Sequence, residues 1–283
     1  LPVWIKDKLF QKSGLIKSLS ETLSDQVDWQ DRLLFGEHHL SHAASSFYTS
    51  PYESAAILTI DGVGEWATTT IAHGRQQNID VLEELHFPHS LGLLYSAFTY
   101  YLGFRVNSGE YKVMGLAPYG QPLYQDLITE HLIDLREDSS FRLNMAYFDY
   151  PAGLTMTHPR FESLFDRPRR EPESPLEQFH MDVAASIQKV TEKVVLNLAQ
   201  RAAAITGENR VCLSGGVALN CVANGELARA AVDVTIERPF VDVMVEINGE
   251  RGETIVLDEG TSPAVTLAIT NTLDEVINDL TLI

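Results

Sequence analysis

The sequence has little cysteine, few cations and no long apolar run. Two cysteines among 283 residues are too few for a disulfide framework. Lys and Arg total 21 against 39 Asp and Glu, a net charge of −18, which disfavours nucleic acid as a partner. The longest stretch without acidic residues, lysine or arginine is 85–104, and its polar residues favour a buried helix over a membrane span. No secretory signal pattern is present at residue 1, so we expect a cytoplasmic protein.

What is present is typical of a globular α/β chain. Hydrophobic residues make up 45% and charged residues 21%, which excludes disordered and fibrous classes. The segment 232–283 differs from the rest, with 11 acids, two bases and alternating apolar residues that predict β hairpins. We therefore expect one domain over residues 1–231 and a separate β-rich tail over residues 232–283.

Hydrophobic periodicity predicts the elements of the first domain. Three strands of an antiparallel meander are expected at 55–60, 66–72 and 79–85. Helical stripes run through 91–102 and from about Leu176 to a stop at Gly207. The segment 138–174 shows no clear period, which predicts a lid-like loop.

A candidate metal site is the pair His38 and His42 with Asp61. Histidines four residues apart project from the same face of a helix and can share an ion. Asp61 follows an apolar strand and precedes two nearby glycines, where a carboxylate can approach a ligand. A histidine cluster without metal, and an ordinary Asp-Gly turn, are the alternatives for each motif alone.

A candidate anion or nucleotide site is the bend at Gly215 and Gly216. It follows a predicted strand and precedes a predicted helix, where free amides can bind an anion, and Asn220 lies just beyond it. Glu110 and Lys112 lie in a glycine-punctuated segment, 107–120, predicted as a loop that reaches into a cleft. A structural turn and solvated loop charges are the alternatives.

Five motifs in order resemble a known family. They are H-H-L-S-H-A-A-S-S-F-Y (38–48), L-T-I-D-G-V-G-E-W-A-T-T (58–69), H-S-L-G-L-L-Y-S-A-F-T-Y-Y-L-G-F (89–104), G-E-Y-K-V-M-G-L-A-P-Y-G (109–120) and L-S-G-G-V-A-L-N-C-V-A-N-G (213–225). Over about residues 30 to 230 the sequence closely resembles the O-carbamoyltransferases of nodulation-factor, cephamycin and tobramycin biosynthesis.

The resemblance implies a fold and a reaction. The fold is the actin/Hsp70-like (ASKHA) ATPase-type domain, here partial. The reaction is transfer of a carbamoyl group from carbamoyl adenylate, made from carbamoyl phosphate and ATP, to the hydroxyl of a small acceptor such as a sugar or aminoglycoside. The implied metal is Fe²⁺ or another divalent ion.

The resemblance also implies roles for individual residues. The metal ligands would be His38, His42 and Asp61. The carbamoyl adenylate would contact Gly215, Gly216 and Asn220, with Glu110 and Lys112 in the same cleft. Asp182 would face the acceptor and is the candidate general base.

The sequence also departs from the family pattern. A first phosphate loop, the Asp of a D-x-G motif that completes the metal site, and an adenylate-forming domain are expected but are not readable here. Asp242 and Asp258 are only weak matches to that Asp. We therefore expect an incomplete chain, with a non-catalytic metal- or nucleotide-binding module as the alternative. A metallohydrolase is less favoured, because no Glu lies between His38 and His42 to act as base.

Overall fold

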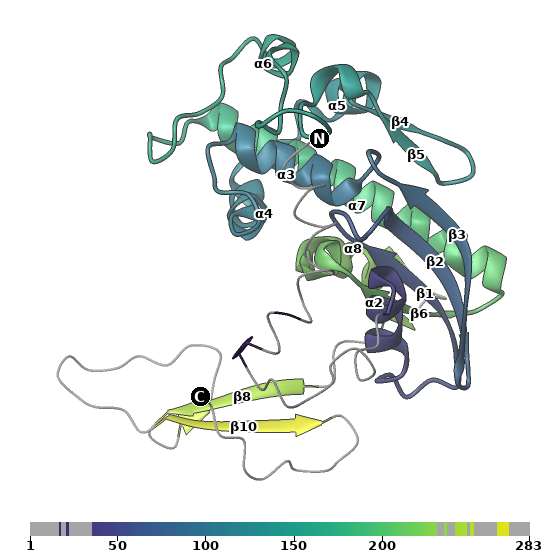
Figure 1. Ribbon diagram of the computed structural model, residues 1–283. Helices are drawn as coiled ribbons and strands as arrows, with labels where there is room; N and C mark the ends of the chain where they lie inside the picture. The colour runs from purple at the N-terminus through teal and green to yellow at the C-terminus, as the bar shows by residue number, and fades with distance from the viewer. Residues whose placement is uncertain are drawn as a thin grey trace.

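A computed structural model describes residues 17, 21–22 and 36–229, and the backbone of 230, 235–236, 241–247, 250–251 and 265–271 (Figure 1). The helices are α2 (His38–Phe47), α3 (Leu91–Tyr101), α4 (Glu110–Leu116), α5 (Gln125–His131), α6 (Pro159–Phe165), α7 (Gln178–Thr206) and α8 (Cys221–Ala230), with short 3₁₀ turns η1 (Ala117–Tyr119), η2 (Met145–Tyr147) and η3 (Gly216–Leu219). The strands are β1 (Ser54–Ile60), β2 (Ala67–Arg75), β3 (Asn78–His86), β4 (Ile133–Leu135), β5 (Phe141–Leu143), β6 (Arg210–Ser214), β7 (Thr235–Ile236), β8 (Val241–Ile247), β9 (Glu250–Arg251) and β10 (Val265–Asn271). The class is mixed α/β, as predicted.

A five-stranded mixed sheet has the order β3-β2-β1-β6-β7. Strands β1, β2 and β3 form the predicted antiparallel meander, with Leu58 opposite Ile71. Strand β6 lies parallel to β1, with Thr59 opposite Ser214, and β7 is parallel to β6. Because β1 and β6 are parallel neighbours, their carboxyl ends meet at one edge of the sheet, which brings Asp61 beside the glycine bend.

Strand β1 is buried on both faces, and its side chains alternate between two core clusters. Ala56, Leu58 and Ile60 pack in the large cluster formed with α3 and α7. Ala55 and Ile57 pack in a smaller cluster against Ala43 and Phe47 of α2. The sheet therefore lies between α2 on one face and α7 on the other (Figure 1). This explains why the strand is a continuous apolar run rather than an alternating one.

Helix α7 crosses from the meander to β6 as a single 29-residue helix. Its buried face includes Val183, Ile187, Val190, Val194 and Leu198. It ends at Gly207 in the left-handed conformation (φ 71°), which confirms the predicted stop. Within the described residues, no helix combines the length and apolar character that crossing a bilayer requires.

Two segments that we predicted as loops contain regular structure. The segment 138–174 includes β5, η2 and α6, and the aromatic rings of Phe161 and Phe165 in α6 pack into the large core cluster. The segment 107–120 contains α4, whose Val113 and Leu116 are buried. Both predictions of a loop were wrong, because short helices with only two apolar anchors carry too little periodicity to be read.

The acidic tail contains antiparallel strands where alternation predicted them. Strand β8 pairs with β10 and with β9. The same alternation predicts a further strand at 255–257, and these residues lie outside the described part of the chain. That residues 232–283 form a separate unit stays a prediction.

A polar cluster joins the start of β1 to the turn before β6. The Ser54 hydroxyl donates to Glu208 Oε1 at 2.5 Å, and His73 Nε2 lies 2.9 Å from the same oxygen. The Ser54 hydroxyl holds the pKa of Glu208 below its ordinary value against the opposing effect of burial, and His73 adds to this lowering. A depressed carboxyl pKa stabilises the fold above the pKa of the unfolded chain, and the stabilisation is lost as pH falls through the folded value.

We therefore expect Glu208→Gln to lower the free energy of unfolding by about 1 kcal/mol at about pH 7 and by much less near about pH 3. Urea denaturation of both proteins at the two pH values measures the difference. Glu137→Gln, at an exposed glutamate, is the control and should match the wild type. An equal loss for Glu208→Gln at both pH values would show that the charge is not what stabilises this corner.

Candidate metal centre and adjoining cavity

Helix α2 presents two histidines toward the end of β1. His38 begins the helix and His42 follows one turn later, so both rings lie on the same face. The backbone N–H of His38 donates to Glu65 Oε2 at 3.1 Å, which places a carboxylate at the positive end of the helix. The turn 62–66, which directly follows Asp61, therefore holds the N-terminal end of α2 in place.

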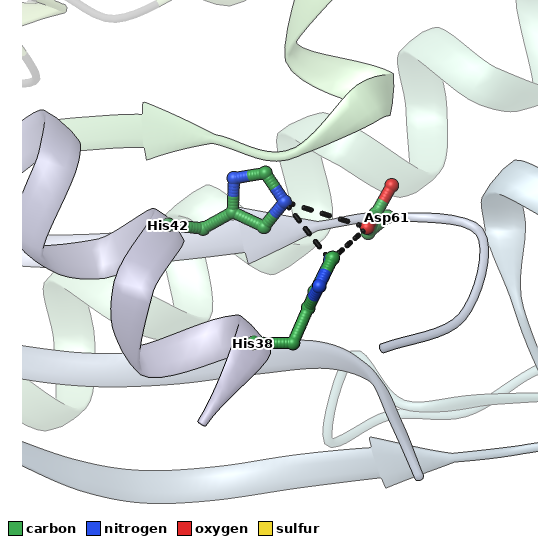
Figure 2. Close-up of side chains that lie close together, drawn as sticks. All are labelled: His38, His42 and Asp61. Atoms are coloured by element: carbon green, nitrogen blue, oxygen red, sulfur yellow. Dashed lines mark hydrogen bonds and ion pairs between the residues drawn. The ribbon is translucent and has the colours of Figure 1, made fainter. Parts of the chain in front are cut away.

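His38, His42 and Asp61 converge on one small volume (Figure 2). His38 Nε2 lies 2.7 Å from Asp61 Oδ2, His42 Nε2 lies 3.1 Å from His38 Nε2, and His42 Nε2 lies 3.4 Å from Asp61 Oδ2. Ligands about 2.1 Å from a single ion are about 3.0–3.4 Å apart in octahedral or tetrahedral geometry. Two of the three separations fall in this range, and the 2.7 Å between His38 and Asp61 is a hydrogen-bond distance, so a small outward shift of one side chain would place all three as ligands of one divalent ion.

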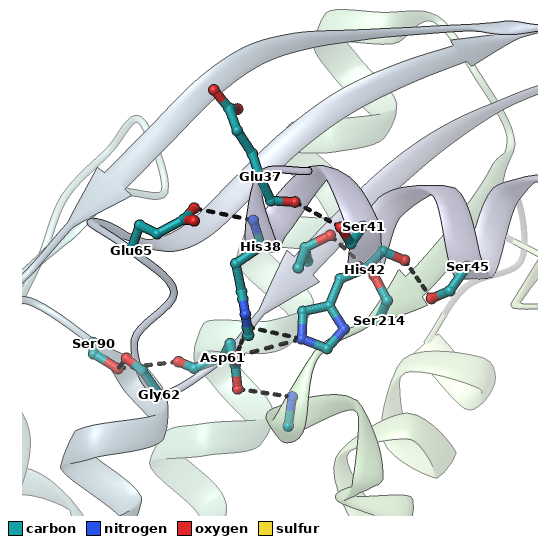
Figure 3. Close-up of polar contacts among 12 residues, drawn as sticks. Glu37, His38, Ser41, His42, Ser45, Asp61, Gly62, Glu65, Ser90 and Ser214 are labelled. Atoms are coloured by element: carbon teal, nitrogen blue, oxygen red, sulfur yellow. Dashed lines mark hydrogen bonds and ion pairs between the residues drawn. The ribbon is translucent and has the colours of Figure 1, made fainter. Parts of the chain in front are cut away.

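The other oxygen of Asp61 is held by the glycine bend. Its Oδ1 accepts a hydrogen bond from the Gly216 N–H at 3.1 Å, and the Ser90 hydroxyl donates to the carbonyls of Asp61 and Gly62 (Figure 3). Burial opposes ionisation, but hydrogen bonds from His38 and from the Gly62 and Gly216 amides keep the pKa of Asp61 below its ordinary value. Asp61 is therefore a carboxylate at neutral pH.

Glycines allow the backbone to close around the end of β1. At Gly215 the φ angle is 91°, and a Cβ atom there would lie 2.3 Å from the Ile60 carbonyl oxygen. A Cβ atom at Gly92 would lie 2.7 Å from the Asp61 carbonyl oxygen. Any side chain at these positions would separate the bend and α3 from Asp61.

A cavity of about 380 Å³ opens beside Asp61 and Gly216. Its walls come from the end of β1, from α3, from the start of α4 and from η3. Asp61, Glu110, Gly216 and Asn220 all line it. The volume falls in the range of small-ligand sites. The structure thus brings together four of the predicted site residues around a single cavity, next to both histidines.

Glu110 has a structural role within this wall. Its Oε1 accepts from the Ser96 hydroxyl at 2.8 Å and from the Asn107 N–H at 3.0 Å, and its Oε2 accepts from the Gly109 N–H at 3.1 Å. The carboxylate therefore fixes the turn before α4 to helix α3. Glu110 lies in the predicted cleft, but most of its hydrogen-bonding capacity is used by the protein.

Asn220 is oriented by a buried glutamine that sequence reasoning missed. Its Oδ1 accepts from the Ala223 N–H and from Gln188 Nε2, and its Nδ2 donates to Gln188 Oε1, each at 3.0 Å. Tyr95 also donates to Gln188 Oε1, at 3.0 Å. The Ala223 N–H requires the oxygen of Asn220 on its side, which assigns the amide orientation. The available signal was a glutamine within the apolar stripe of α7.

Two predicted site residues lie away from this cavity. Asp182 is buried in α7, where its Oδ1 accepts from the Gln121 N–H at 2.8 Å and from Gln178 Nε2 at 2.9 Å. Lys112 lies on the other side of α4, where it lines a different cavity. The structure does not bring either residue to Asp61, so their assigned roles stay predictions. Asp258 and the side chain of Asp242 lie outside the described residues.

The middle histidine of the H-H-L-S-H motif belongs to the core. His39 is 6% exposed, and neither ring nitrogen has a hydrogen-bond partner among the described residues. Burial lowers the pKa of His39, so the ring is neutral near pH 7. A Cβ atom at Gly64 would lie 2.7 Å from this ring, which shows how closely the turn after β1 packs on it.

Comparison with known proteins finds relatives along most of the chain. It is 58% identical over 229 residues to the "Uncharacterized protein sll1178" of Synechocystis sp., covering 81% of this chain and 37% of that protein. It is 36% identical over 230 residues to the "Nodulation protein NolNO" of Sinorhizobium fredii, covering 81% of this chain and 31% of that protein. It is 36% identical over 191 residues to the "Nodulation protein NolO" of Bradyrhizobium diazoefficiens, covering 67% and 32%.

The chain thus spans about a third of the length of these curated relatives. The family described as "Carbamoyltransferase N-terminus" matches residues 1–245, which include the whole candidate site. The match confirms the resemblance that the five motifs carry. The chain belongs to the carbamoyltransferase N-terminus family.

Proposed function

We propose that this chain contributes the metal- and nucleotide-binding part of an O-carbamoyltransferase. The proposed reaction moves a carbamoyl group from carbamoyl adenylate, formed from carbamoyl phosphate and ATP, to the hydroxyl of a small acceptor. The observation that carries the proposal is the convergence of His38, His42 and Asp61 beside a cavity bordered by the Gly216 amide. Family membership supports the kind of reaction.

The order of the central sheet supports an actin/Hsp70-like ATPase-type fold for the domain. Three antiparallel strands lead into two strands parallel to the first, with β1 at the centre. Ligands in open α/β sheets bind beyond the carboxyl ends of the strands, near the point where the strand order reverses. Asp61 follows β1 and Gly215 follows β6, at that edge.

The donor set fits a divalent transition metal. Two imidazoles and one carboxylate suit Fe²⁺ and Zn²⁺, and three protein ligands leave positions for a substrate. A bound ion would polarise a carbonyl or offset phosphate charge. Asp61 would hold the ion with one oxygen and the glycine bend with the other, which couples the metal centre to the wall of the cavity.

The remaining residues supply recognition of the donor. The Gly216 region borders the cavity with backbone that a ligand can approach closely. Asn220 lines the cavity, and its amide is already bonded to Gln188 and lies beside the Tyr95 hydroxyl. These contacts prevent the amide from rotating, so Asn220 would present a polar group to the ligand in an orientation set before the ligand arrives.

An activity assay tests the proposal. The purified chain, loaded with Fe²⁺ under anaerobic conditions, is incubated with ATP, carbamoyl phosphate and a panel of hydroxylated acceptors, and mass spectrometry detects an added carbamoyl group. A product that disappears in Asn220→Ala would support the proposed role. Metal and nucleotide binding without any product would favour a non-catalytic binding module. The observation that favours this second candidate is the burial of Asp182, the predicted general base, away from the cavity.

A further inference from the structure

A second cavity, of about 610 Å³, lies on the other side of the segment that borders the metal cavity. Residues 107, 108, 110 and 111 line the metal cavity, whereas residues 104–106 and Lys112 line the second one. The opposite wall of the second cavity comes from Tyr150, from 153–156 and from Arg169. The two cavities therefore share one wall but have no lining residue in common.

Three cations line the second cavity in a chain that is strongly acidic overall. These are Arg105, Lys112 and Arg169, and Glu173 is the single acid among the lining residues. Within residues 36–230, none of the three cations forms an ion pair with another residue, although acids outnumber bases 39 to 21 in the sequence. Cations left unpaired in an acidic protein concentrate positive potential in one place.

Arg169 is held in position before any ligand arrives. Its Nε donates to the Tyr100 carbonyl oxygen at 2.8 Å, and its guanidinium carbon lies 4.0 Å from the centroid of the Tyr100 ring. This stacking fixes the plane of the guanidinium, and within the described part of the chain no hydrogen bond uses its two terminal amino groups, which leaves them for a ligand. A guanidinium with two free amino groups is suited to bidentate binding of phosphate oxygens.

The walls on both sides are fixed by buried polar contacts. Glu110 holds the turn before α4, as described above. Arg170, which is 8% exposed, donates from Nε to the Leu102 carbonyl at 2.7 Å and also bonds the Ser174 carbonyl. Lys112 projects from α4 with its Nζ 5.9 Å from the centroid of the Phe104 ring. These contacts fix the backbone of the segments that carry the three cations.

We propose that this cavity is a second ligand site, which binds a phosphate-bearing small molecule. Three cations around one space match the multiple charge of a phosphate group better than that of a single carboxylate. The cavity has the volume of a small-ligand site, and apolar side chains such as Phe104 and Tyr150 provide surface for the remainder of the molecule. A long polyanion is disfavoured, because the net charge of −18 would repel it outside the cavity.

Isothermal titration calorimetry of the full chain in EDTA with inorganic pyrophosphate tests the site without metal or transfer activity. We expect a Kd on the order of 1 mM or tighter. Separate titrations with glucose 1-phosphate and AMP, and with uncharged glucose and adenosine, distinguish the possible sources of the phosphate. Equal binding of the charged and uncharged forms would overturn the proposal. So would tighter binding of single-stranded RNA than of every small phosphate.

Variants separate this cavity from the metal cavity. Lys112→Gln and Arg169→Gln should each weaken pyrophosphate binding by about tenfold, and Arg169→Lys should recover only part of the loss. Arg160→Gln, at an exposed arginine outside both cavities, should bind as the wild type does. Asn220→Ala should also bind normally. Loss in Asn220→Ala with retention in Lys112→Gln would assign the anion to the metal cavity, and an equal loss in Arg160→Gln would show unspecific attraction.

This site is additional to the proposed transferase chemistry. A chain that binds pyrophosphate through Lys112 and Arg169 but forms no carbamoylated product would support the second site and contradict the proposed function. A chain that forms product but binds no phosphate in EDTA would support the proposed function and contradict the second site. The two proposals therefore fail separately.

Discussion

Replacing Asp61 by asparagine is expected to weaken binding of Fe²⁺ by at least about 100-fold, since loss even of outer contacts to metal ligands costs 10- to 100-fold. The substitution removes the only charged ligand of the three and keeps the shape of the side chain. Asparagine Oδ1 can still accept from the Gly216 N–H, so the loss should fall on the metal rather than on the glycine bend. Anaerobic equilibrium dialysis with metal analysis measures the affinity.

The matched control for this prediction is Asp126→Asn. Asp126 is an exposed aspartate in the first turn of α5, outside the cluster, and its replacement should leave metal affinity unchanged. His38→Ala and His42→Ala should each weaken binding as well, because each leaves two ligands. Thermal unfolding of every variant checks that the fold persists. Wild-type affinity in Asp61→Asn would show that the three side chains do not form a metal centre.

Gly215→Ala is expected to lower the free energy of unfolding by about 3 kcal/mol or more. Gly215 combines a φ of 91° with a ψ of 172°, a region that is essentially restricted to glycine. The added methyl group would also meet the Ile60 carbonyl oxygen at 2.3 Å, and backbone at the end of a buried strand has little freedom to retreat. Urea denaturation followed by tryptophan fluorescence measures the loss.

Gly225→Ala provides the comparison at the same type of substitution. Gly225 lies in α8, where an added Cβ atom would meet nothing closer than an arginine side-chain nitrogen at 3.8 Å. Alanine is favoured over glycine inside a helix, so stability should rise by up to about 1 kcal/mol. Similar small effects at both positions would mean that the bend after β6 tolerates a side chain, and that its conformation is not required.

The metal cluster was predictable because its ligands come from short, recognisable sequence motifs. Two histidines at helical spacing and an aspartate after an apolar strand predicted the cluster, and the structure brings their ligand atoms within 4.8 Å of one another. The ion itself stays a prediction. The meander and the end of α7 at Gly207 were also predictable, because local sequence patterns determine both.

The rest depended on packing between distant segments. Gln188 forms hydrogen bonds with Tyr95 and Asn220, which lie 93 and 32 residues away, and no local pattern contains that information. Asp182 was predicted to face the acceptor, but its side chain holds the backbone of Gln121 instead. Lys112 and Glu110 are two residues apart on α4, so they point to different sides of the helix and line different cavities.

The two contacts of the Asp61 carboxylate span very different lengths of chain. Asp61 lies 23 residues from His38 but 155 residues from Gly216, which it also binds. Short-range contacts cost less chain entropy to close and form earlier than long-range ones. The three ligands can therefore assemble as soon as α2 docks on β1, during synthesis and before β6 emerges. The Gly216 amide can join Asp61 only when β6 adds to the sheet, so the wall of the metal cavity closes after the three ligands have met.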